Sequence, residues 1–243
     1  MCIYRLPLGQ SIVRPRSYCP DCGQFIRWYD NVPVLSYLIL RGQCRYCQRG
    51  ISFRYPLVEL LSAFLSFLVY QKVGGGLPYA LYFLLLVAPL IVISLIDLKY
   101  QIIPDVLSLT GIPAGFLTIL LTSGLPWHES VLISLKGAVV GGGLLFSLGW
   151  CYEKLRHQEG LGGGDVKLAA MLGAFFGWKE IFIIFLLSSF LGTLVGLAWI
   201  LIKKGGLKLA IPYGPFLAAG ALVNLFWGQQ ILRGYLQWAQ SFH

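Results

Sequence analysis

Two aspartates stand out because acidic side chains are scarce in this apolar chain. Asp97 ends the apolar run that starts at Leu90, and Asp165 directly follows three glycines at 162–164. A carboxyl group at a membrane segment costs free energy, so its presence there indicates a functional site. Two carboxyl groups that share one proton can hydrolyse a peptide bond: one takes a proton from water and the other donates to the carbonyl oxygen. We therefore expect Asp97 and Asp165 to form an aspartyl protease dyad.

The glycines before Asp165 fit such a site. Gly162 and Gly164 can adopt positive φ and let a substrate strand approach the backbone beside the acid. We assign Gly162, Gly164 and Lys167 to a substrate-access loop. The alternative interpretation is a flexible helix-capping loop in which Asp165 is the N-cap residue.

Other ionisable residues fit less specific roles. Asp105 follows Pro104 near an expected helix start, where a capping or helix-dipole role is favoured over a catalytic one. Glu59 lies inside an apolar segment and either marks a polar site or pairs with Arg54. The three histidines share no common spacing, so the sequence shows no ligand set for a metalloprotease.

The cysteines predict a metal site. Two pairs, Cys19-Pro-Asp-Cys22 and Cys44-Arg-Tyr-Cys47, form a CxxC arrangement that suits tetrahedral zinc. Four thiolates would fill the coordination sphere and leave no position for water, so we expect Zn²⁺ in a structural role. Redox activity of either CxxC is the alternative interpretation.

The elements that carry these residues are expected to be membrane helices. The chain has 243 residues, of which 57% are hydrophobic and only 12% charged, as is typical of a polytopic membrane protein. We predict an all-α protein with about seven transmembrane helices, near residues 56–70, 79–96, 102–122, 131–150, 166–178, 181–202 and 207–228.

The first 54 residues differ from the remainder. They hold eight arginines and four of the six cysteines, and they predict a small cytoplasmic zinc-binding module, residues 1–54, before a transmembrane protease domain, residues 55–243. Arginines beside a first membrane segment favour a topogenic role over binding to nucleic acid, which we do not expect. A cytoplasmic module places most loop cations on the same side, in line with the positive-inside rule; they are Lys99, Lys154, Arg156, Lys203, Lys204 and Lys208. Asp97 and Asp165 then lie at the cytoplasmic boundary.

The sequence resembles the bacterial type IV prepilin peptidase family along nearly its whole length. Motifs in the first 59 residues resemble the family's cytoplasmic module; they are Ile3–Pro7, Ser17–Cys22, Asp30–Tyr37, Leu40–Cys44 and Ile51–Glu59. Asp97–Asp105 and Gly162–Lys167 resemble its two aspartate motifs, and Tyr213–Phe216 is similar to its late motif.

The resemblance implies a bifunctional enzyme of the bacterial inner membrane. Such an enzyme cleaves the basic leader of prepilins and pseudopilins after a glycine, then N-methylates the new terminus using S-adenosylmethionine. We look for the methyl-donor site in or beside the zinc module, near Asn31, Pro33 and Glu59. Family members usually carry an apolar segment before the motif at Ile3, and this sequence starts almost on that motif, so we expect seven crossings instead of the usual eight.

Two other classes of protein are compatible with the residues alone. A presenilin-like aspartyl protease shares the Gly-x-Gly-Asp pattern, but the cysteine module and the residues after Asp97 weigh against it. A small-solute membrane transporter with a zinc-stabilised cytoplasmic head would use Asp97, Asp165 and Lys136 along an ion pathway. No two-half repeat is evident to support that alternative.

Overall fold

The computed structural model describes residues 2–11, 14, 16–156, 162–203 and 211–240. Lys204, Lys208 and the first residues of the expected segment 207–228 lie outside these ranges. The chain divides into two compact units, residues 1–71 and 72–243. The expected boundary at 54/55 coincides with the start of a long helix, whereas the two units divide near that helix's end.

The N-terminal unit consists of short helical pieces followed by one long helix. Its elements are α1 (Cys2–Arg5), η1 (Leu6–Leu8), η2 (Trp28–Asn31), α2 (Leu35–Ile39) and α3 (Arg54–Val73). Between them, two turns carry the CxxC pairs, and each turn is closed by one bridged pair, Tyr18 with Phe25 and Gln43 with Gly50. The first 54 residues thus form little regular structure, which leaves them few hydrophobic contacts of their own.

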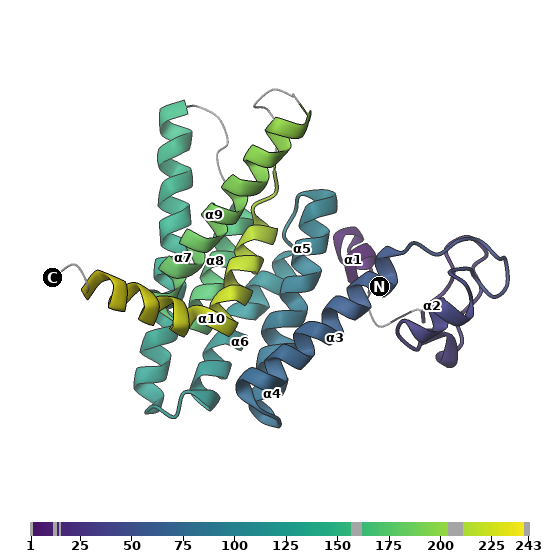
Figure 1. The fold of residues 1–243 in the computed structure, drawn as a ribbon, viewed down its shortest axis with the longest axis horizontal. Coiled ribbons are helices and arrows are strands. Elements are labelled where there is room, and N and C mark those ends of the chain that lie inside the picture. The colour runs from purple at the N-terminus through teal and green to yellow at the C-terminus, as the bar shows by residue number, and fades with distance from the viewer. Residues whose placement is uncertain (1, 12–13, 15, 157–161, 204–210, 241–243) are drawn as a thin grey trace. The chain divides into compact units, whose positions relative to one another are not determined.

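The second unit is a bundle of long helices (Figure 1). Its elements are α4 (Leu77–Tyr82), the π-helical turn η3 (Phe83–Val87), α5 (Ala88–Tyr100), α6 (Asp105–Thr122), α7 (Trp127–Arg156), α8 (Gly163–Phe176), α9 (Trp178–Lys203) and α10 (Gly214–Gln240). The first three run on as one helix over residues 77–100. Pro104, which cannot donate a backbone hydrogen bond, precedes the start of α6.

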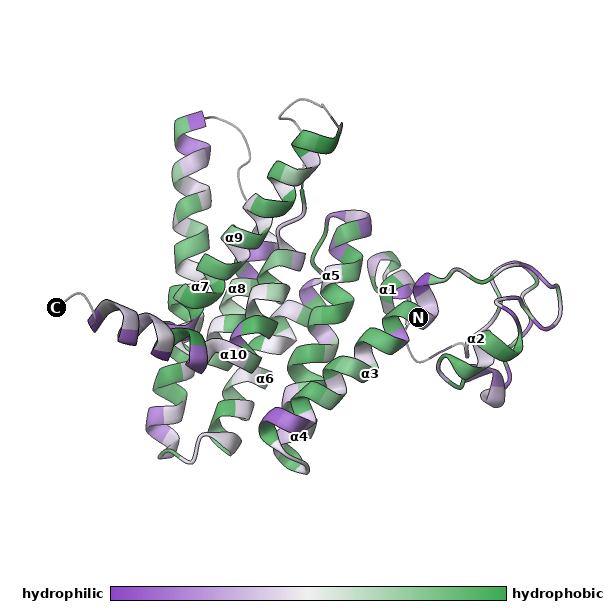
Figure 2. Ribbon diagram, in the orientation of Figure 1, coloured by the Kyte–Doolittle hydropathy of each residue, from purple (hydrophilic) through white to green (hydrophobic). Residues whose placement is uncertain are grey.

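Five helices of the described chain are long and apolar enough to cross a membrane: residues 54–73, 77–100, 105–122, 127–156 and 178–202. Within the described residues each of the seven expected segments overlaps a helix, but α8 and α10 are not among these five. The 14 residues of α8 rise only about 21 Å, less than a hydrocarbon core of about 30 Å. The end of α10 is largely hydrophilic, in contrast to the apolar helices before it (Figure 2).

The core of the second unit lies around α8, which packs against α6, α7 and α9 (Figure 1). Leu168, Met171 and Leu172 of α8 are fully buried. Large apolar side chains on the outer helices remain exposed, such as Leu186 and Phe146, as expected of surfaces that face lipid.

Glycines allow α7 to approach α8 closely. Gly137 and Gly173 face each other so closely that a Cβ on either would overlap the carbonyl of the other. Gly141 and Gly142 also face α8, whereas a Cβ on Gly143 would meet no atom within 4 Å. Small residues at helix crossings are the usual means of close packing in membranes, so Gly141 and Gly142 contribute to this crossing and Gly143 does not.

Candidate active site

Asp97 lies one turn before the end of α5. The helix ends because Gln101 adopts a left-handed conformation, φ 54°, and donates its N–H to the Asp97 carbonyl at 2.8 Å. The Asp97 side chain is only 4% exposed. Its Oδ2 accepts a hydrogen bond of 3.0 Å from the backbone N–H of Gly214, the first residue of α10. Two distant segments thus fix this carboxyl group.

Asp165 lies in the first turn of α8, which begins after Gly162. Its backbone N–H donates to the Gly162 carbonyl at 3.0 Å, as in an ordinary helix start. Among the described residues, its buried Oδ1 has no hydrogen-bond partner. Asp165 lies outside the five candidate spans, and burial, together with the nearby charge of Asp97, raises the pKa of this carboxyl group to about 6.

The two aspartates line the same cavity. It has a volume of about 270 Å³ and is also lined by the loop 101–103, Asp105 and the glycines 162–164. The end of α5 and the start of α8 therefore meet there, although 68 positions separate the two acids in the chain. A shared cavity of this kind can admit a short stretch of peptide and a water molecule.

The glycines beside Asp165 do not adopt the backbone conformation that the sequence suggested. Gly162 has φ −66° and Gly164 is helical, so neither adopts positive φ and that expectation is wrong. A Cβ on Gly164 would instead lie 2.9 Å from Cβ of Ile103, whereas a Cβ on Gly163 would meet nothing within 4 Å. Gly164 thus lets the start of α8 pack against the loop that follows Asp97.

Lys167 and Asp105 form an ion pair at the edge of the cavity. Lys167 Nζ donates to both carboxylate oxygens of Asp105, at 2.7 and 2.8 Å. Asp105 is the first residue of α6, where a negative charge is favourable, but no side chain caps that helix. Sequence reasoning recognised the helix start and missed the pairing, because 62 positions separate the two residues.

The four cysteines of the N-terminal unit lie together. Their sulfur atoms are all within 4.8 Å of one another, with 3.8 Å between Cys19 and Cys47 and 4.0 Å between Cys22 and Cys44. Zinc–sulfur bonds of 2.3 Å at tetrahedral angles place sulfur atoms about 3.8 Å apart. Backbone N–H groups of Cys47 and Tyr46 lower the pKa of Cys44 to about 7, whereas burial and the neighbouring thiols raise the pKa of Cys47 to about 11. The residues fit one Zn²⁺.

The two CxxC turns repeat one backbone pattern. The N–H of Gly23 donates to the Cys19 carbonyl, and the N–H of Gln48 donates to that of Cys44, both at 2.9 Å. Gly23 and Gln48 adopt positive φ at this equivalent position. Such tight turns direct two thiols toward one point, so each CxxC supplies half of the tetrahedral set.

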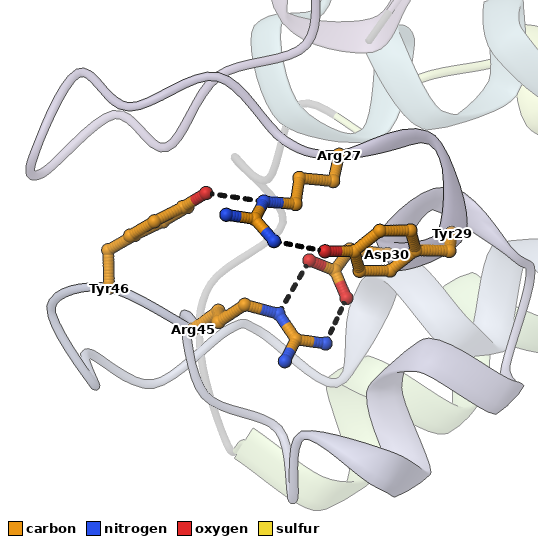
Figure 3. Close-up of polar contacts among 5 residues, drawn as sticks. All are labelled: Arg27, Tyr29, Asp30, Arg45 and Tyr46. Carbon is orange, nitrogen blue, oxygen red and sulfur yellow. Dashed lines mark hydrogen bonds and ion pairs between the residues drawn. The ribbon is translucent and has the colours of Figure 1, made fainter.

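Polar contacts tie the second cysteine turn to residues 27–30 (Figure 3). Arg45 donates to both oxygens of Asp30 at 2.8 and 2.6 Å, and Arg27 donates to the hydroxyl groups of Tyr46 and Tyr29. The Arg45 guanidinium lowers the pKa of Asp30. These arginines are therefore engaged within the module, which accounts for part of its basic composition without nucleic acid.

The residues suggested for methyl transfer are partly brought together. Glu59 of α3 accepts a 2.7 Å hydrogen bond from the N–H of Val34, the neighbour of Pro33. Val34 adopts φ 60° and ψ −48°, which is costly for a β-branched residue and therefore indicates a constrained turn. Asn31 ends η2, two residues before Pro33.

Comparisons with known proteins match both units. The description "Bacterial Peptidase A24 N-terminal domain" matches residues 1–73, and "Type IV leader peptidase family" matches residues 84–197. A prepilin leader peptidase/N-methyltransferase of Aeromonas salmonicida is 42% identical over 93% of this chain and 76% of its own length. The chain belongs to the type IV leader peptidase family. Asp97 and Asp165 both lie within the matched peptidase region.

Other relatives agree with this family assignment. Proteins with the same description from Pseudomonas aeruginosa and Xanthomonas campestris are 41% and 36% identical, over 94% and 98% of this chain and 77% and 80% of their own lengths. The chain thus spans roughly three quarters of the length of these leader peptidases. No solved structure matches it. The transporter alternative finds no support in these relatives.

Proposed function

We propose that the chain is a membrane aspartyl endopeptidase that cleaves the leader of prepilins or pseudopilins with Asp97 and Asp165, and N-methylates the product. Membership of the leader peptidase family supports both activities. The observation that carries the site assignment is that both carboxyl groups, from separate helices, line one cavity. The cavity is bordered by Gly162 and Gly164, and Lys167 pairs with Asp105 at its edge. These positions support the proposed role of the three residues in substrate access.

The proposed cleavage step uses one shared proton. The ionised carboxyl group takes a proton from water as the water oxygen adds to the scissile carbonyl carbon, and the protonated group donates to the carbonyl oxygen. The carbon–nitrogen bond then breaks: the leaving amine takes the proton that the first carboxyl group received from water, and the former carbonyl oxygen returns its proton to the second. Gly214 N–H holds Oδ2 of Asp97, while the buried Oδ1 of Asp165 has no partner within the described residues, which leaves its hydrogen-bonding capacity unused.

We assign the sites for Zn²⁺ and for S-adenosylmethionine to the N-terminal unit, residues 1–71. Cys19, Cys22, Cys44 and Cys47 hold Zn²⁺ in a structural role, since four thiolates complete its coordination. S-adenosylmethionine, which supplies the methyl group, binds beside the turn of Asn31 and Pro33, where the carboxylate of Glu59 favours a sulfonium cation. The constrained turn at Val34 supports this location.

We place the protein in the bacterial inner membrane, with residues 1–54 as the cytoplasmic module and residues 55–243 as the protease domain. The five candidate spans support a multi-pass arrangement. The loop cations support a cytoplasmic location for the module and for both aspartates. Leader peptides carry basic residues that also remain on the cytoplasmic side, so substrate and dyad would meet at one face.

Substitution of the dyad tests this function. Purified protein is incubated with a prepilin, and cleaved pilin is quantified by mass spectrometry. Asp97→Asn and Asp165→Asn should each reduce cleavage at least about a hundredfold, because general acid–base catalysis contributes that much or more. Asp105→Asn is the matched control, since Asp105 lines the same cavity but pairs with Lys167; it should cleave within a few-fold of wild type. Wild-type cleavage by either dyad variant rejects the assignment.

A further inference from the structure

The start of α10 contacts Asp97 from a position 117 residues further along the chain. The N–H of Gly214 donates to Oδ2 of Asp97 at 3.0 Å, and this hydrogen bond is buried. The bond has an ordinary length and lies away from water, so it restrains the orientation of the carboxyl group. The dyad mechanism needs two carboxyl groups and does not by itself explain this third element.

Gly214 has no room for a side chain. A Cβ at this position would lie 2.6 Å from Oδ2 and 3.3 Å from Cγ of Asp97. Gly214 does not adopt positive φ, so the requirement for glycine is one of space, not of backbone conformation. The atom in the way is the end of a flexible side chain. A larger residue would therefore move the Asp97 carboxyl group while leaving the helices in place.

Tyr213 anchors the segment that presents Gly214. Its carbonyl accepts the N–H groups of Phe216 and Leu217 at 3.0 and 3.1 Å, which starts α10. Its hydroxyl group lies 2.9 Å from Oγ of Ser188 on α9, a side chain with no exposed surface. The contact between α9 and α10 thus determines where the Gly214 N–H points.

We propose that Gly214 and Tyr213 are positioning residues for peptide cleavage, which hold the Asp97 carboxyl group in its reactive orientation from α10, with Ser188 as the anchor on α9. This inference rests on the proposed catalytic role of Asp97 and adds the element that orients it. It predicts a loss in the chemical step without a matching loss in substrate binding.

The first test is Gly214→Ala against Gly192→Ala. A Cβ on Gly192 would meet only the Phe216 ring, at an ordinary 3.6 Å, so this control adds the same methyl group in the neighbouring helix without touching Asp97. Gly214→Ala should lower kcat for prepilin cleavage about tenfold to a hundredfold, as expected for a displaced catalytic group, with KM within about twofold. Gly192→Ala should retain both constants.

The second test removes the anchor in two ways. Tyr213→Phe and Ser188→Ala each delete one partner of the 2.9 Å contact, and Tyr213→Phe also removes a 3.4 Å contact with Oγ of Ser189. Each should lower kcat by about two- to tenfold, with the larger loss in Tyr213→Phe. The double variant should lower kcat no further than the stronger single variant, because the bond can be lost only once. Additive losses would show that the two hydroxyl groups act separately and would overturn the anchoring role.

Thermal unfolding of each variant separates positioning from stability. If Gly214→Ala matches Gly192→Ala in kcat, or loses activity only in proportion to its unfolded fraction, the positioning role is overturned. If Asp97→Asn itself cleaves at the wild-type rate, the proposed dyad fails instead. Loss of cleavage in Asp97→Asn with full cleavage in Gly214→Ala would retain the dyad and reject only this inference.

Discussion

Gly163 and Gly164 are alike in sequence but differ in their surroundings. A Cβ on Gly164 would press on Cβ of Ile103 at 2.9 Å, whereas Gly163 has open space. Ile103 also lies next to Gly214, where an added Cβ would meet its Cδ1 at 3.2 Å. The loop after Asp97 is therefore held between two glycines, and the spacing of the dyad depends on their lack of side chains.

We predict that Gly164→Ala reduces prepilin cleavage about tenfold to a hundredfold. The added methyl group separates α8 from the Ile103 loop, and displacements of about 1 Å at a catalytic site have effects of this size. Gly163→Ala, the matched control, should cleave at nearly the wild-type rate. The measurement is kcat/KM on a leader-containing peptide. Equal rates for the two variants would contradict the packing role of Gly164.

At the scale of elements, the sequence predicted the helices better than it predicted the crossings. Apolar runs located every helix of residues 72–243, because their period and length reflect burial in lipid or protein. The 14-residue α8 was predicted as a helix, but it is too short to be a candidate membrane span. Its apolar residues are buried by α6, α7 and α9, so composition alone overestimates the number of crossings. Asp97 and Asp165, which line one cavity, were singled out because charged residues are rare in this chain. The hydrogen bond from Gly214 to Asp97 was not predicted, because every residue except proline has a backbone N–H and its partner cannot be identified from the sequence.

The crossing of α7 and α8 should be sensitive to a single methyl group. Gly137→Ala or Gly173→Ala forces the two backbones apart, because a Cβ on either glycine would overlap the backbone carbonyl of the other. Overpacking of this kind costs about 1–3 kcal/mol, so we expect a clear fall in Tm of the detergent-solubilised protein. Gly143→Ala, on the same helix but with no atom within 4 Å, should keep or slightly raise Tm. A similar Tm for all three variants would argue against close helix contact.

The cysteine turns should depend on metal for their fold. The N-terminal 54 residues have little regular structure, and a structural zinc commonly supplies the stability that such a small module lacks. We expect about one zinc per chain, measured by metal analysis of purified protein, and a loss of that zinc in Cys19→Ser and Cys44→Ser. Cys151→Ser is the control, because Cys151 is exposed on α7, outside this cluster. Unchanged zinc in the Cys19 and Cys44 variants would rule out the four-thiolate site.

For the molecule as a whole, the proposed sites fall in different compact units. Asp97, Asp165 and Gly214 belong to residues 72–243, whereas the cysteine cluster and Glu59 belong to residues 1–71. The two matched family regions follow the same division, at residues 1–73 and 84–197. Each unit contains its own set of fixed side chains, so a substitution that removes one set leaves the contacts of the other intact.

The two activities should therefore be separable by substitution. Asp97→Asn should abolish cleavage yet methylate a pilin whose leader has already been removed, with transfer of radiolabelled methyl groups as the measurement. Glu59→Gln should do the opposite, since it weakens the hydrogen bond that constrains the Val34 turn and removes the charge proposed to favour the sulfonium. It should lower methylation at least about tenfold and leave cleavage within twofold. Parallel loss of both activities in the Glu59 variant, at unchanged Tm, would contradict a methyl-donor role for Glu59 that is separate from cleavage.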